Sequence, residues 1–554
     1  MTRRYQGINK ICGNTAGLKS NIRRRIENLK RRRVSPHEVI SPDLSRDLAR
    51  LSFNSGRQLG LLLSRDGNVE TVLVGDSNSV FIPDLPKSRE GRRRLRGIRL
   101  VHTHLNSESI SQEDIMDMVF LRLDLTGVVH VDDHGGATTL ELAHILPTNG
   151  DRQKGWEVLP AIPCYRPELD FLRLVQSLED ELERNRSTVP ATKRQDRTIL
   201  VSVTNADRKT ALDSMNELTE LAQTSGIVVA DKIIQRERKI NPKFLIGKGK
   251  LSEIIVRALQ LGVDLLIFNQ ELNPSQIRAI TDITELRVID RAQLILDIFA
   301  QRAQSREGKI QVEMAQLKYL LPRLVVRDDA LSRLTGGIGA RGPGETKLEI
   351  DRRRIKDRIA HLERELNKVR KRRAQKRSLR LRKKVPIISI VGYTNAGKST
   401  LLNSLTNSHV FVESQHFATL DPTSRRLRFP RDFEVIITDT VGFIKDLPQD
   451  LLDAFVATLE ELQDADLLLH VIDASDPQLD EHIEAVHRTL TQLELHQKPT
   501  IMVFNKMDLA DTTMLHHDLK SYGGVAICAL STKTLGPLIQ TMEDHVESLS
   551  TEVP

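Results

Sequence analysis

The stretch Gly-Tyr-Thr-Asn-Ala-Gly-Lys-Ser occupies residues 392–399 and matches the pattern of a phosphate-binding loop. An apolar run typical of a strand precedes it, and a segment with helical spacing follows it. In that context the glycines let backbone N–H groups cradle phosphate oxygens, Lys398 reaches the β- and γ-phosphates, and the Ser399 hydroxyl binds Mg²⁺. A chance glycine turn can carry the same letters, so the assignment depends on motifs elsewhere in the chain.

Three further motifs follow in the order of a guanine-nucleotide site. Asp-Thr-Val-Gly at residues 439–442 ends an apolar run, and Asp439 is expected to hold Mg²⁺ through water. Asn-Lys-Met-Asp ends at Asp508, whose carboxylate can accept a pair of hydrogen bonds that guanine offers and adenine lacks. Ile-Cys-Ala-Leu at 527–530 stands where a backbone amide would meet the guanine O6. Together the motifs predict GTP as the ligand.

The predicted site residues come from these motifs and from the segment Phe-Ala-Thr-Leu-Asp-Pro-Thr at 417–423. Thr419 is the expected switch threonine on Mg²⁺, and Thr423 is the less favoured alternative. The residues expected to contact GTP are Gly392, Tyr393, Thr394, Asn395, Ala396, Gly397, Lys398, Ser399, Thr400, Phe417, Thr419, Asp439, Gly442, Asn505, Lys506, Asp508, Cys528, Ala529 and Leu530. The expected Mg²⁺ ligands are Ser399, Thr419 and Asp439, and the expected catalytic residues are Lys398, Thr419 and Gly442.

Two positions raise the question of how the attacking water is held. Phe443 follows Gly442, where Ras-like proteins carry a glutamine that orients this water. Phenylalanine cannot orient water, so we expect slow intrinsic hydrolysis unless another group positions it. Asn395 resembles the P-loop asparagine of GTPases that use a monovalent cation such as K⁺ in place of an arginine finger. The alternative is that Asn395 only shapes the loop.

Hydrophobic periodicity divides the chain into four expected domains. In residues 386–548 apolar runs alternate with helical patterns, which predicts a doubly wound sheet with strands at 387–391, 435–438, 467–472, 501–504 and 525–529. Residues 197–308 show a smaller α/β alternation, with strands expected at 198–203, 227–234 and 265–268. Residues 1–190 read as mixed α/β, with strands expected at 59–64, 69–75 and 98–102. The predicted fold class is multidomain α/β with a C-terminal P-loop GTPase domain.

The fourth domain, residues 309–384, is expected to be a hairpin of two long helices joined by a glycine-rich tip at 336–344. The expected apolar stripe of the first helix is Val312, Leu317, Leu320 and Leu324, and that of the second is Leu348, Ile355, Ile359, Leu362, Leu366 and Val369. Residues 351–384 hold 17 Lys and Arg against 4 Asp and Glu, although the whole chain has a net charge of only +8. Such a concentrated basic stripe is typical of contact with a nucleic-acid backbone; the alternative is a solvated helix face. A smaller basic cluster lies at 23–33.

Composition excludes several other classes of protein. The chain has 554 residues, and no run approaches the roughly 18 apolar residues of a membrane helix. The basic start is followed by polar residues, so we expect no secretory signal. Cys12, Cys164 and Cys528 lie too far apart to suggest a disulfide or metal pattern. We therefore expect a cytoplasmic protein, without a membrane span and monomeric.

Several stretches upstream of the P-loop make the sequence similar to the HflX family, ribosome-associated GTPases of the Obg–HflX group. They are Ile246–Lys250, Asn269–Gln276, Asp290-Arg291, Leu296–Ala303 and Gly336–Thr346. The similarity runs from about 197 to 548 and extends to the P-loop and the 417–423 segment. It implies GTP-favoured binding to the large ribosomal subunit and its rRNA, and a role in splitting or rescuing stalled ribosomes under stress. Arg341 at the tip and Arg352, Arg353 and Arg354 behind it are candidate rRNA contacts.

The N-terminal extension contains a possible metal-binding pattern, His-Thr-His at 102–104 followed by Ser111 and Asp114. Two histidines two apart on a strand point to the same side, and with Asp114 they could hold Zn²⁺ with an open position. The pattern resembles that of JAMM metalloprotease-like domains, but the spacing to Ser111 is one residue short and Leu105 replaces a common proline. Because Glu70 is the only nearby strand candidate for a catalytic glutamate, a degenerate, inactive domain is favoured over a peptidase; a plain surface histidine pair is a further alternative.

Three functions remain in competition at this point. The leading hypothesis is a GTPase that acts on ribosomes. A nucleotide-switched RNA-binding module whose slow hydrolysis only resets it is the second, and Phe443 keeps it open. A metalloprotease-like N-terminal domain regulated by the GTPase is the third, and bound zinc would favour it.

Overall fold

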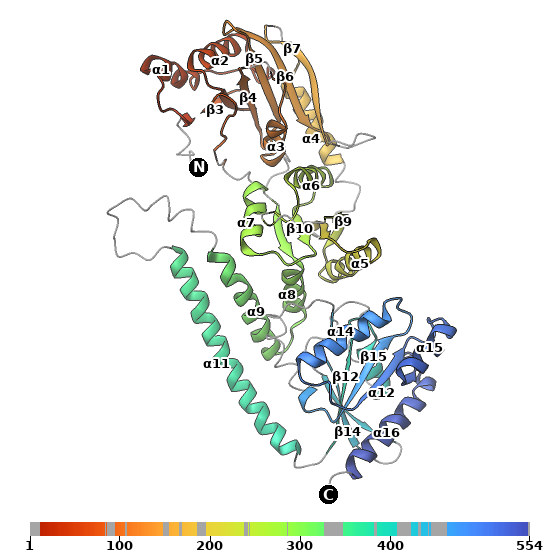
Figure 1. Cartoon of the computed structure of the whole chain (residues 1–554). Coiled ribbons are helices and arrows are strands. Elements are labelled where there is room, and N and C mark those ends of the chain that lie inside the picture. Colours follow the sequence, from red (N-terminus) through yellow and green to blue (C-terminus); the bar gives the residue numbers. More distant parts are fainter. Residues whose placement is uncertain are drawn as a thin grey trace. The chain divides into compact units, whose positions relative to one another are not determined.

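The computed structural model contains three sheets and a long helical hairpin (Figure 1). The residues that it describes are 11–83, 85, 95–105, 108–147, 155–165, 169–184, 196–237, 242, 244–284, 286–325, 347–381, 385–406, 423–429, 434–440, 442–444 and 462–551. One compact unit comprises Met1–Asn205, Val228–Leu266 and Gln276–Val288, and the other Ala206–Ile227, Ile267–Ser275 and Ile289–Pro554. The four-domain division expected from the sequence stays a prediction.

The N-terminal extension forms a seven-stranded sheet in the order β1-β3-β2-β4-β5-β6-β7. Its strands are β1 Ile11–Gly13, β2 Leu59–Ser64, β3 Val69–Val74, β4 Ile98–His104, β5 Leu125–Val131, β6 Ala137–Ile145 and β7 Trp156–Pro163. β4 runs parallel to β5 and antiparallel to β2. The expected strands at 59–64, 69–75 and 98–102 are confirmed, and β4 continues to His104, so both histidines of the predicted metal pattern lie on it.

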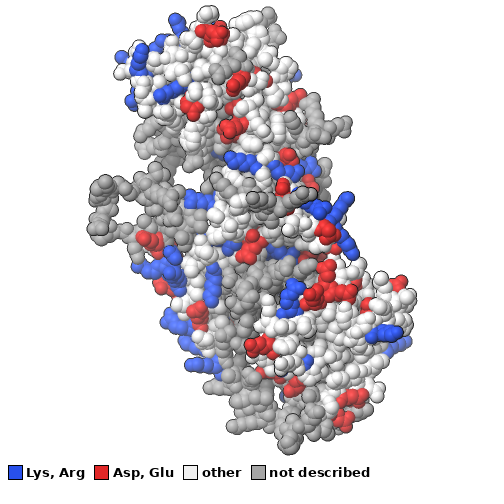
Figure 2. Space-filling view, in the orientation of Figure 1, with Lys and Arg blue, Asp and Glu red and all other residues white. Residues whose placement is uncertain are grey.

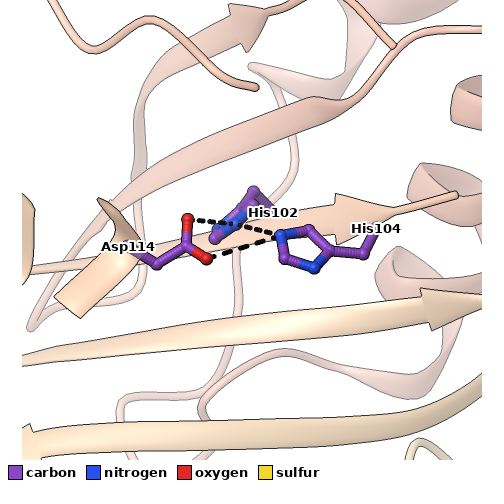
Figure 3. Close-up of side chains that lie close together, drawn as sticks. All are labelled: His102, His104 and Asp114. Atoms are coloured by element: carbon purple, nitrogen blue, oxygen red, sulfur yellow. Dashed lines mark hydrogen bonds and ion pairs between the residues drawn. The ribbon is translucent and has the colours of Figure 1, made fainter. Parts of the chain in front are cut away.

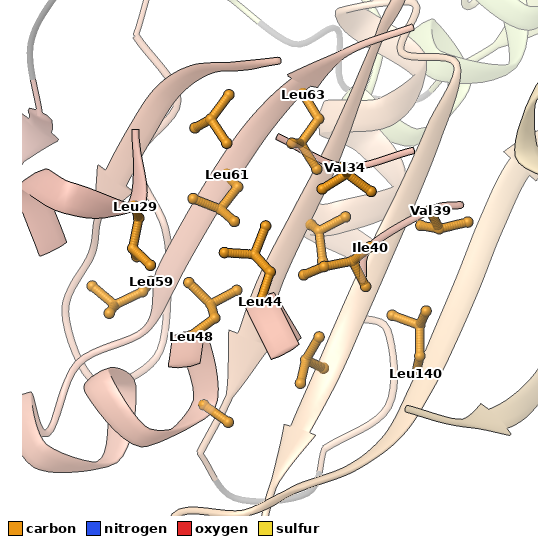
Figure 4. Packing of buried hydrophobic residues seen from close by; sticks show 14 of the residues in the cluster. Leu29, Val34, Val39, Ile40, Leu44, Leu48, Leu59, Leu61, Leu63 and Leu140 are labelled. Carbon is orange, nitrogen blue, oxygen red and sulfur yellow. The ribbon is translucent and has the colours of Figure 1, made fainter. Parts of the chain in front are cut away.

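Helices α1 (Ser20–Leu29), α2 (Pro42–Ser55), α3 (Gln112–Phe120) and α4 (Phe171–Arg184) accompany this sheet. Leu44 and Leu48 of α2 pack against Leu59 and Leu61 of β2 in one buried cluster, which Figure 4 shows from close by. Burial of a leucine side chain contributes about 1.5–3 kcal/mol, so this cluster holds the strand that neighbours β4 in place.

The next sheet has four strands in the order β11-β10-β8-β9. They are β8 Arg197–Thr204, β9 Val228–Arg236, β10 Leu265–Phe268 and β11 Arg287–Asp290, and the helices between them are α5 Arg208–Thr224, α6 Lys248–Leu261, α7 Pro274–Ile283 and α8 Arg291–Arg302. The three strands expected here are confirmed. Gly247 is the N-cap of α6, so the Gly-Lys-Gly-Lys stretch at 247–250 opens a helix.

The hairpin helices are α9 (Arg306–Val325) and α11 (Lys347–Leu381). Ile310 and Met314 of α9 pack against Ile359, Leu362 and Leu366 of α11. Ion pairs Arg306–Glu365 at 3.2 Å and Arg358–Glu313 at 2.7 Å show that the two helices run antiparallel, as expected. The expected stripe of α9 was partly wrong, because Leu320 is 43% exposed while Ile310 and Met314 face the partner helix. The glycine-rich tip and Arg341 lie outside the described residues.

The C-terminal sheet has six strands in the order β13-β14-β12-β15-β16-β17, and only β13 is antiparallel to its neighbour. The strands are β12 Ile387–Gly392, β13 Thr423–Arg428, β14 Glu434–Asp439, β15 Leu467–Asp473, β16 Thr500–Asn505 and β17 Val525–Ala526. Helices α12 Lys398–Thr406, α14 Leu479–Gln492, α15 Thr512–Tyr522 and α16 Gly536–Thr551 follow strands, and the turn Thr532–Thr534 is a 3₁₀ helix. This is the doubly wound sheet that the periodicity predicted. Among the described helices, none is both long enough and apolar enough to cross a membrane.

Candidate nucleotide site

The loop between β12 and α12 has the backbone that a phosphate-binding loop needs. Gly392 has φ +151°, and a Cβ there would lie 2.2 Å from the carbonyl oxygen of Val471 on β15. Gly397 has φ +92°, and a Cβ there would lie 2.2 Å from Nδ2 of Asn505. A side chain at Gly392 would require backbone movement, and one at Gly397 would displace the Asn505 amide, so the glycines of the motif are required by close packing as well as by conformation.

Lys398 lies at the start of α12 and is only 7% exposed. Its ammonium donates a hydrogen bond of 2.6 Å to the backbone oxygen of Tyr393. Burial lowers the pKa of Lys398 to about 8, although the charge of Asp439 opposes the shift. A buried ammonium with so little negative charge around it is stabilised by an incoming phosphate, whose charge would raise the pKa of Lys398 back toward its ordinary value.

The predicted Mg²⁺ ligands Ser399 and Asp439 lie side by side. The Ser399 hydroxyl donates to Oδ2 of Asp439 at 2.6 Å, and Asp439, at the end of β14, is fully buried. A hydroxyl and a carboxylate are hard oxygen donors of the kind that Mg²⁺ prefers, so the pair fits a magnesium ion. Thr419 and Phe417 lie outside the described residues, as does the rest of the 407–422 segment.

Gly442 is brought against the P-loop. A Cβ at Gly442 would lie 3.0 Å from the Lys398 ammonium and 2.8 Å from Cγ2 of Thr394. Phe443 next to it is buried, and its backbone pairs with the P-loop: its N–H donates to the Gly392 oxygen at 3.1 Å, and its oxygen accepts from Thr394 N–H at 2.8 Å. The phenylalanine therefore anchors this segment to the loop.

At the predicted guanine end, Asn505 joins two loops. Its Nδ2 donates to the Ala396 oxygen at 2.9 Å, and its Oδ1 accepts from Ala529 N–H at 2.9 Å. Cys528 N–H donates to the Thr534 hydroxyl at 3.0 Å, so the Cys528 and Ala529 amides of the 527–530 stretch already have partners in the protein. Asp508 is exposed and Leu530 is 83% exposed, which leaves both accessible to a ligand.

Sequence reasoning missed three residues that shape this site. Asp473 ends β15 and accepts a 2.6 Å hydrogen bond from Lys506, which has φ +61°. Thr440 donates at 2.6 Å to the backbone of Ile390 and so ties β14 to β12. His470 on β15 is buried, and its pKa falls to about 3 because of burial and the nearby Lys398 charge, so it stays neutral. Only Asp473 had a signal, since it is a carboxylate at the carboxyl end of an apolar strand.

The remaining predicted contacts lie on the same loop and helix. Asn395 is exposed and has φ +62°, Thr400 is half-buried on α12, and the Tyr393 ring stacks on His482 with centroids 3.7 Å apart. The carboxyl ends of parallel strands β12, β14, β15 and β16 thus gather the described parts of all four motifs at one edge of the sheet. This fold and this arrangement define a P-loop GTPase.

Comparison with known proteins identifies the kind of GTPase. Three family models match: "GTP-binding GTPase N-terminal" at residues 212–300, "GTP-binding GTPase Middle Region" at 302–380 and "50S ribosome-binding GTPase" at 387–506. GTPase HflX of Lacrimispora saccharolytica is 48% identical over 63% of this chain and 82% of its own length. GTPase HflX of Escherichia coli is 44% identical over 62% of this chain and 80% of its own length. The chain belongs to the HflX family of GTPases, and it hydrolyses GTP.

Solved structures of GTP-binding proteins are also similar to this chain. A GTP-binding protein from Sulfolobus solfataricus, in complex with GDP, is 25% identical, with 64% of this chain and 99% of that chain covered and a TM-score of 0.35.

The predicted metal residues of the N-terminal extension are also brought together. His102 and His104 on β4 and Asp114 on α3 form one group (Figure 3). Burial and the neighbouring His102 lower the pKa of His104. Burial acts to raise the pKa of Asp114, but hydrogen bonds from His102 and Ser111 bring it below its ordinary range. Glu70 is exposed on β3, which is separated from β4 by β2, so it does not join this group.

Proposed function

We propose that this GTPase binds the large ribosomal subunit in its GTP state and acts in splitting or rescuing ribosomes under stress. The observation that carries the proposal is the joint presence of the GTPase site and the basic helix α11 in one HflX chain. The matched model over residues 387–506 is that of a 50S ribosome-binding GTPase, which supports the same partner. Binding to rRNA through phosphates is governed by charge and shape, which suits a long basic helix.

Helix α11 carries more positive charge than its ion pairs neutralise. Arg358 is paired with Glu313, and Arg354 lies 3.5 Å from Asp351. Further exposed basic residues in the described part of the helix are Arg352, Lys356, Arg364, Lys368 and Lys371. Figure 2 shows blue side chains along this helix. Its buried face is already occupied by α9, so the basic face is the one left for a partner.

Charge reversal on α11 tests this contact. Changing Arg352, Arg353 and Arg354 together to Glu is expected to lower the stimulation of GTP hydrolysis by large subunits by roughly tenfold or more, because each lost phosphate contact weakens binding. Hydrolysis without ribosomes is expected to stay unchanged. The matched control changes the exposed residues Arg23, Arg24 and Arg25 of α1 to Glu, which alters the net charge equally. An equal loss in both variants would mean that α11 is not the specific contact.

We also propose that K⁺ assists hydrolysis at Asn395, which lies exposed in the left-handed region at φ +62° in the P-loop. A cation there would supply the positive charge that an arginine finger supplies elsewhere. Replacing K⁺ by Na⁺ at constant ionic strength should then lower turnover by roughly tenfold or more without changing GTP affinity. If turnover is the same in both salts, Asn395 serves only to shape the loop.

The switch-module alternative rests on Phe443. Its side chain is buried and its backbone is tied to the P-loop, so it leaves the attacking water without the glutamine of Ras-like proteins. If the protein is a switch module, ribosomes would bind its GTP form but would leave the rate of GTP hydrolysis unchanged. The measurement that separates the two functions is the turnover rate with large subunits present.

A further inference from the structure

One side chain of the P-loop is anchored far from the nucleotide motifs in the sequence. Tyr393 is 6% exposed, and its hydroxyl donates a hydrogen bond of 2.5 Å to Oε1 of Glu217 on α5, a residue 176 positions away in the chain. The other side of the contact is aromatic, since the Tyr393 ring stacks on His482 of α14 with the ring planes 11° apart. Glu217, Tyr393 and His482 all belong to one compact unit. A carboxylate outside the GTPase domain thus contacts the loop that is expected to hold the phosphates.

The Glu217 carboxylate is fixed by a second donor. Its Oε2 accepts a hydrogen bond of 2.8 Å from Nη2 of Arg291, the first residue of α8. The two side chains are 15% and 8% exposed, so this ion pair is largely shielded from water. A hydrogen bond between two charged groups is stronger than one between neutral groups. Arg291 therefore holds the carboxylate in place while its other oxygen accepts from Tyr393.

The contacts of Arg291 return to α5. Its Nη1 donates to Oδ1 of Asn269 at 3.3 Å, and Nδ2 of Asn269 donates to the Ser214 hydroxyl at 2.7 Å. Ser214 and Glu217 are three residues apart on α5, so they lie on the same side of the helix. The four side chains form a closed ring of hydrogen bonds that limits the rotamers open to Glu217.

This ring gives a role to two sequence stretches that the nucleotide site does not use. Asn269 begins the stretch 269–276, and Arg291 follows Asp290 in the pair that was also typical of the family. Asp290 is fully buried, caps α8 with its side chain and accepts a hydrogen bond from the Tyr319 hydroxyl on α9. The start of α8, which carries Arg291, is therefore itself held firmly.

The P-loop segment around Tyr393 needs such support because of its backbone. Gly392 and Asn395, on either side of it, both have positive φ, +151° and +62°. Phosphate binding requires several N–H groups of the loop to point in one direction. A loop that is already ordered loses less conformational entropy when its ligand binds. An anchor on the Tyr393 side chain would supply this order.

We propose that Glu217 is a positioning residue of the GTPase site, which holds Tyr393 and so preorganises the P-loop for the phosphates of the nucleotide. Glu217 acts through Tyr393 and does not touch the nucleotide. Because the anchor acts on the loop and not on the γ-phosphate, GDP and GTP should gain equally from it. The proposal concerns nucleotide binding and stands whether or not the chain acts on ribosomes.

The affinity of the full-length protein for fluorescent GDP and GTP analogues tests the proposal. Glu217→Ala and Tyr393→Phe should each raise the Kd for both nucleotides by roughly threefold to tenfold, the effect of one lost hydrogen bond. The double variant should bind no more weakly than the weaker single variant, because both changes remove the same contact. Turnover at saturating GTP should stay within about twofold of wild type, because uniform binding affects KM and not kcat.

The matched control is Asp213→Ala, which removes a carboxylate one turn before Glu217 on the same helix and should leave both affinities unchanged. An equal loss of affinity in this control would mean that the net charge of α5 matters and the anchor does not. Wild-type affinity in Tyr393→Phe, or losses that add in the double variant, would overturn the proposal. So would a lower turnover at saturating GTP with unchanged affinity, since it would place the effect in the chemical step. If Glu217→Ala fails to fold, Tyr393→Phe decides alone, because it removes only a hydroxyl and keeps the stacked ring.

Discussion

Lys398→Ala should lower GTP turnover by roughly 10²–10³-fold and weaken GTP binding, because it removes the P-loop side chain that is expected to contact the developing phosphate charge. The lysine is 7% exposed, and burial lowers its pKa to about 8. An ammonium held in so poorly solvated a place is stabilised mainly by the ligand. Removal of the lysine side chain should therefore lower GTP affinity and turnover more than it lowers the stability of the fold.

The measurement is single-turnover hydrolysis together with titration of a fluorescent GTP analogue. Lys520→Ala, at an exposed position of α15 in the same domain, is the matched control and should behave as wild type. The melting temperature of both variants should remain within a few degrees of the wild-type value, because no hydrophobic contact is lost. Turnover by Lys398→Ala within about twofold of wild type would refute the site, since the phosphate contact is worth far more than that.

Asp508→Asn should lower the affinity for GTP by roughly 10²-fold and raise that for XTP, the xanthine nucleotide. The carboxylate is expected to accept hydrogen bonds from guanine N1–H and from the exocyclic amine. An amide still accepts from N1–H, but its NH₂ group opposes the guanine amine and can donate to the extra carbonyl of xanthine. The Asp508 side chain is exposed, so the substitution should leave the fold intact.

Competition between GTP and XTP for the bound fluorescent nucleotide measures this switch. Glu484→Gln neutralises an exposed carboxylate on α14 of the same domain and should leave the preference for guanine unchanged. If Asp508→Asn still prefers GTP by the wild-type ratio, guanine is read by another group, and the amides of 528–530 become the first candidates.

The sequence predicted the GTPase domain well because its signals are local. The P-loop needs glycine at Gly392 and Gly397 for reasons that the structure makes explicit, namely contacts of 2.2 Å that a Cβ would make with β15 and Asn505. Apolar runs of four to six residues marked the parallel strands, since such strands are buried on both faces. Strand β13 (Thr423–Arg428) was missed, because its Thr-Ser-Arg-Arg-Leu-Arg sequence at the sheet edge carries almost no apolar signal.

Some hydrogen-bond partners between distant segments could not be predicted. The hydrogen bond from Lys506 to Asp473 and the engagement of the Cys528 amide by Thr534 depend on how loops meet, which no periodicity encodes. The inward face of α9 was partly misplaced for a similar reason. Helix α9 is apolar on more than one side, and only packing against α11 determines that Ile310 and Met314, rather than Leu320, face it.

The group His102, His104 and Asp114 in the extension was predictable in one respect and unpredictable in another. That His102 and His104 share one side of a strand follows from the period of two residues, and the sequence was sufficient for it. The approach of Asp114 required the turn into α3 and its Ser111 cap. The distance of Glu70 from the histidines could not be predicted either. It depends on the strand order, in which β2 lies between β3, which carries Glu70, and β4, which carries the histidines.

The most direct test of the account is the rate of GTP hydrolysis at fixed Mg²⁺ and K⁺, measured with and without purified large ribosomal subunits. The account predicts slow intrinsic turnover, because Phe443 cannot position the attacking water. It also predicts that large subunits stimulate hydrolysis by at least roughly tenfold, because contact with the ribosome would position that water. Small subunits are the control and should stimulate much less. Tight GTP binding with a hydrolysis rate that large subunits do not change would contradict a ribosome-activated GTPase and leave a nucleotide-switched binding module.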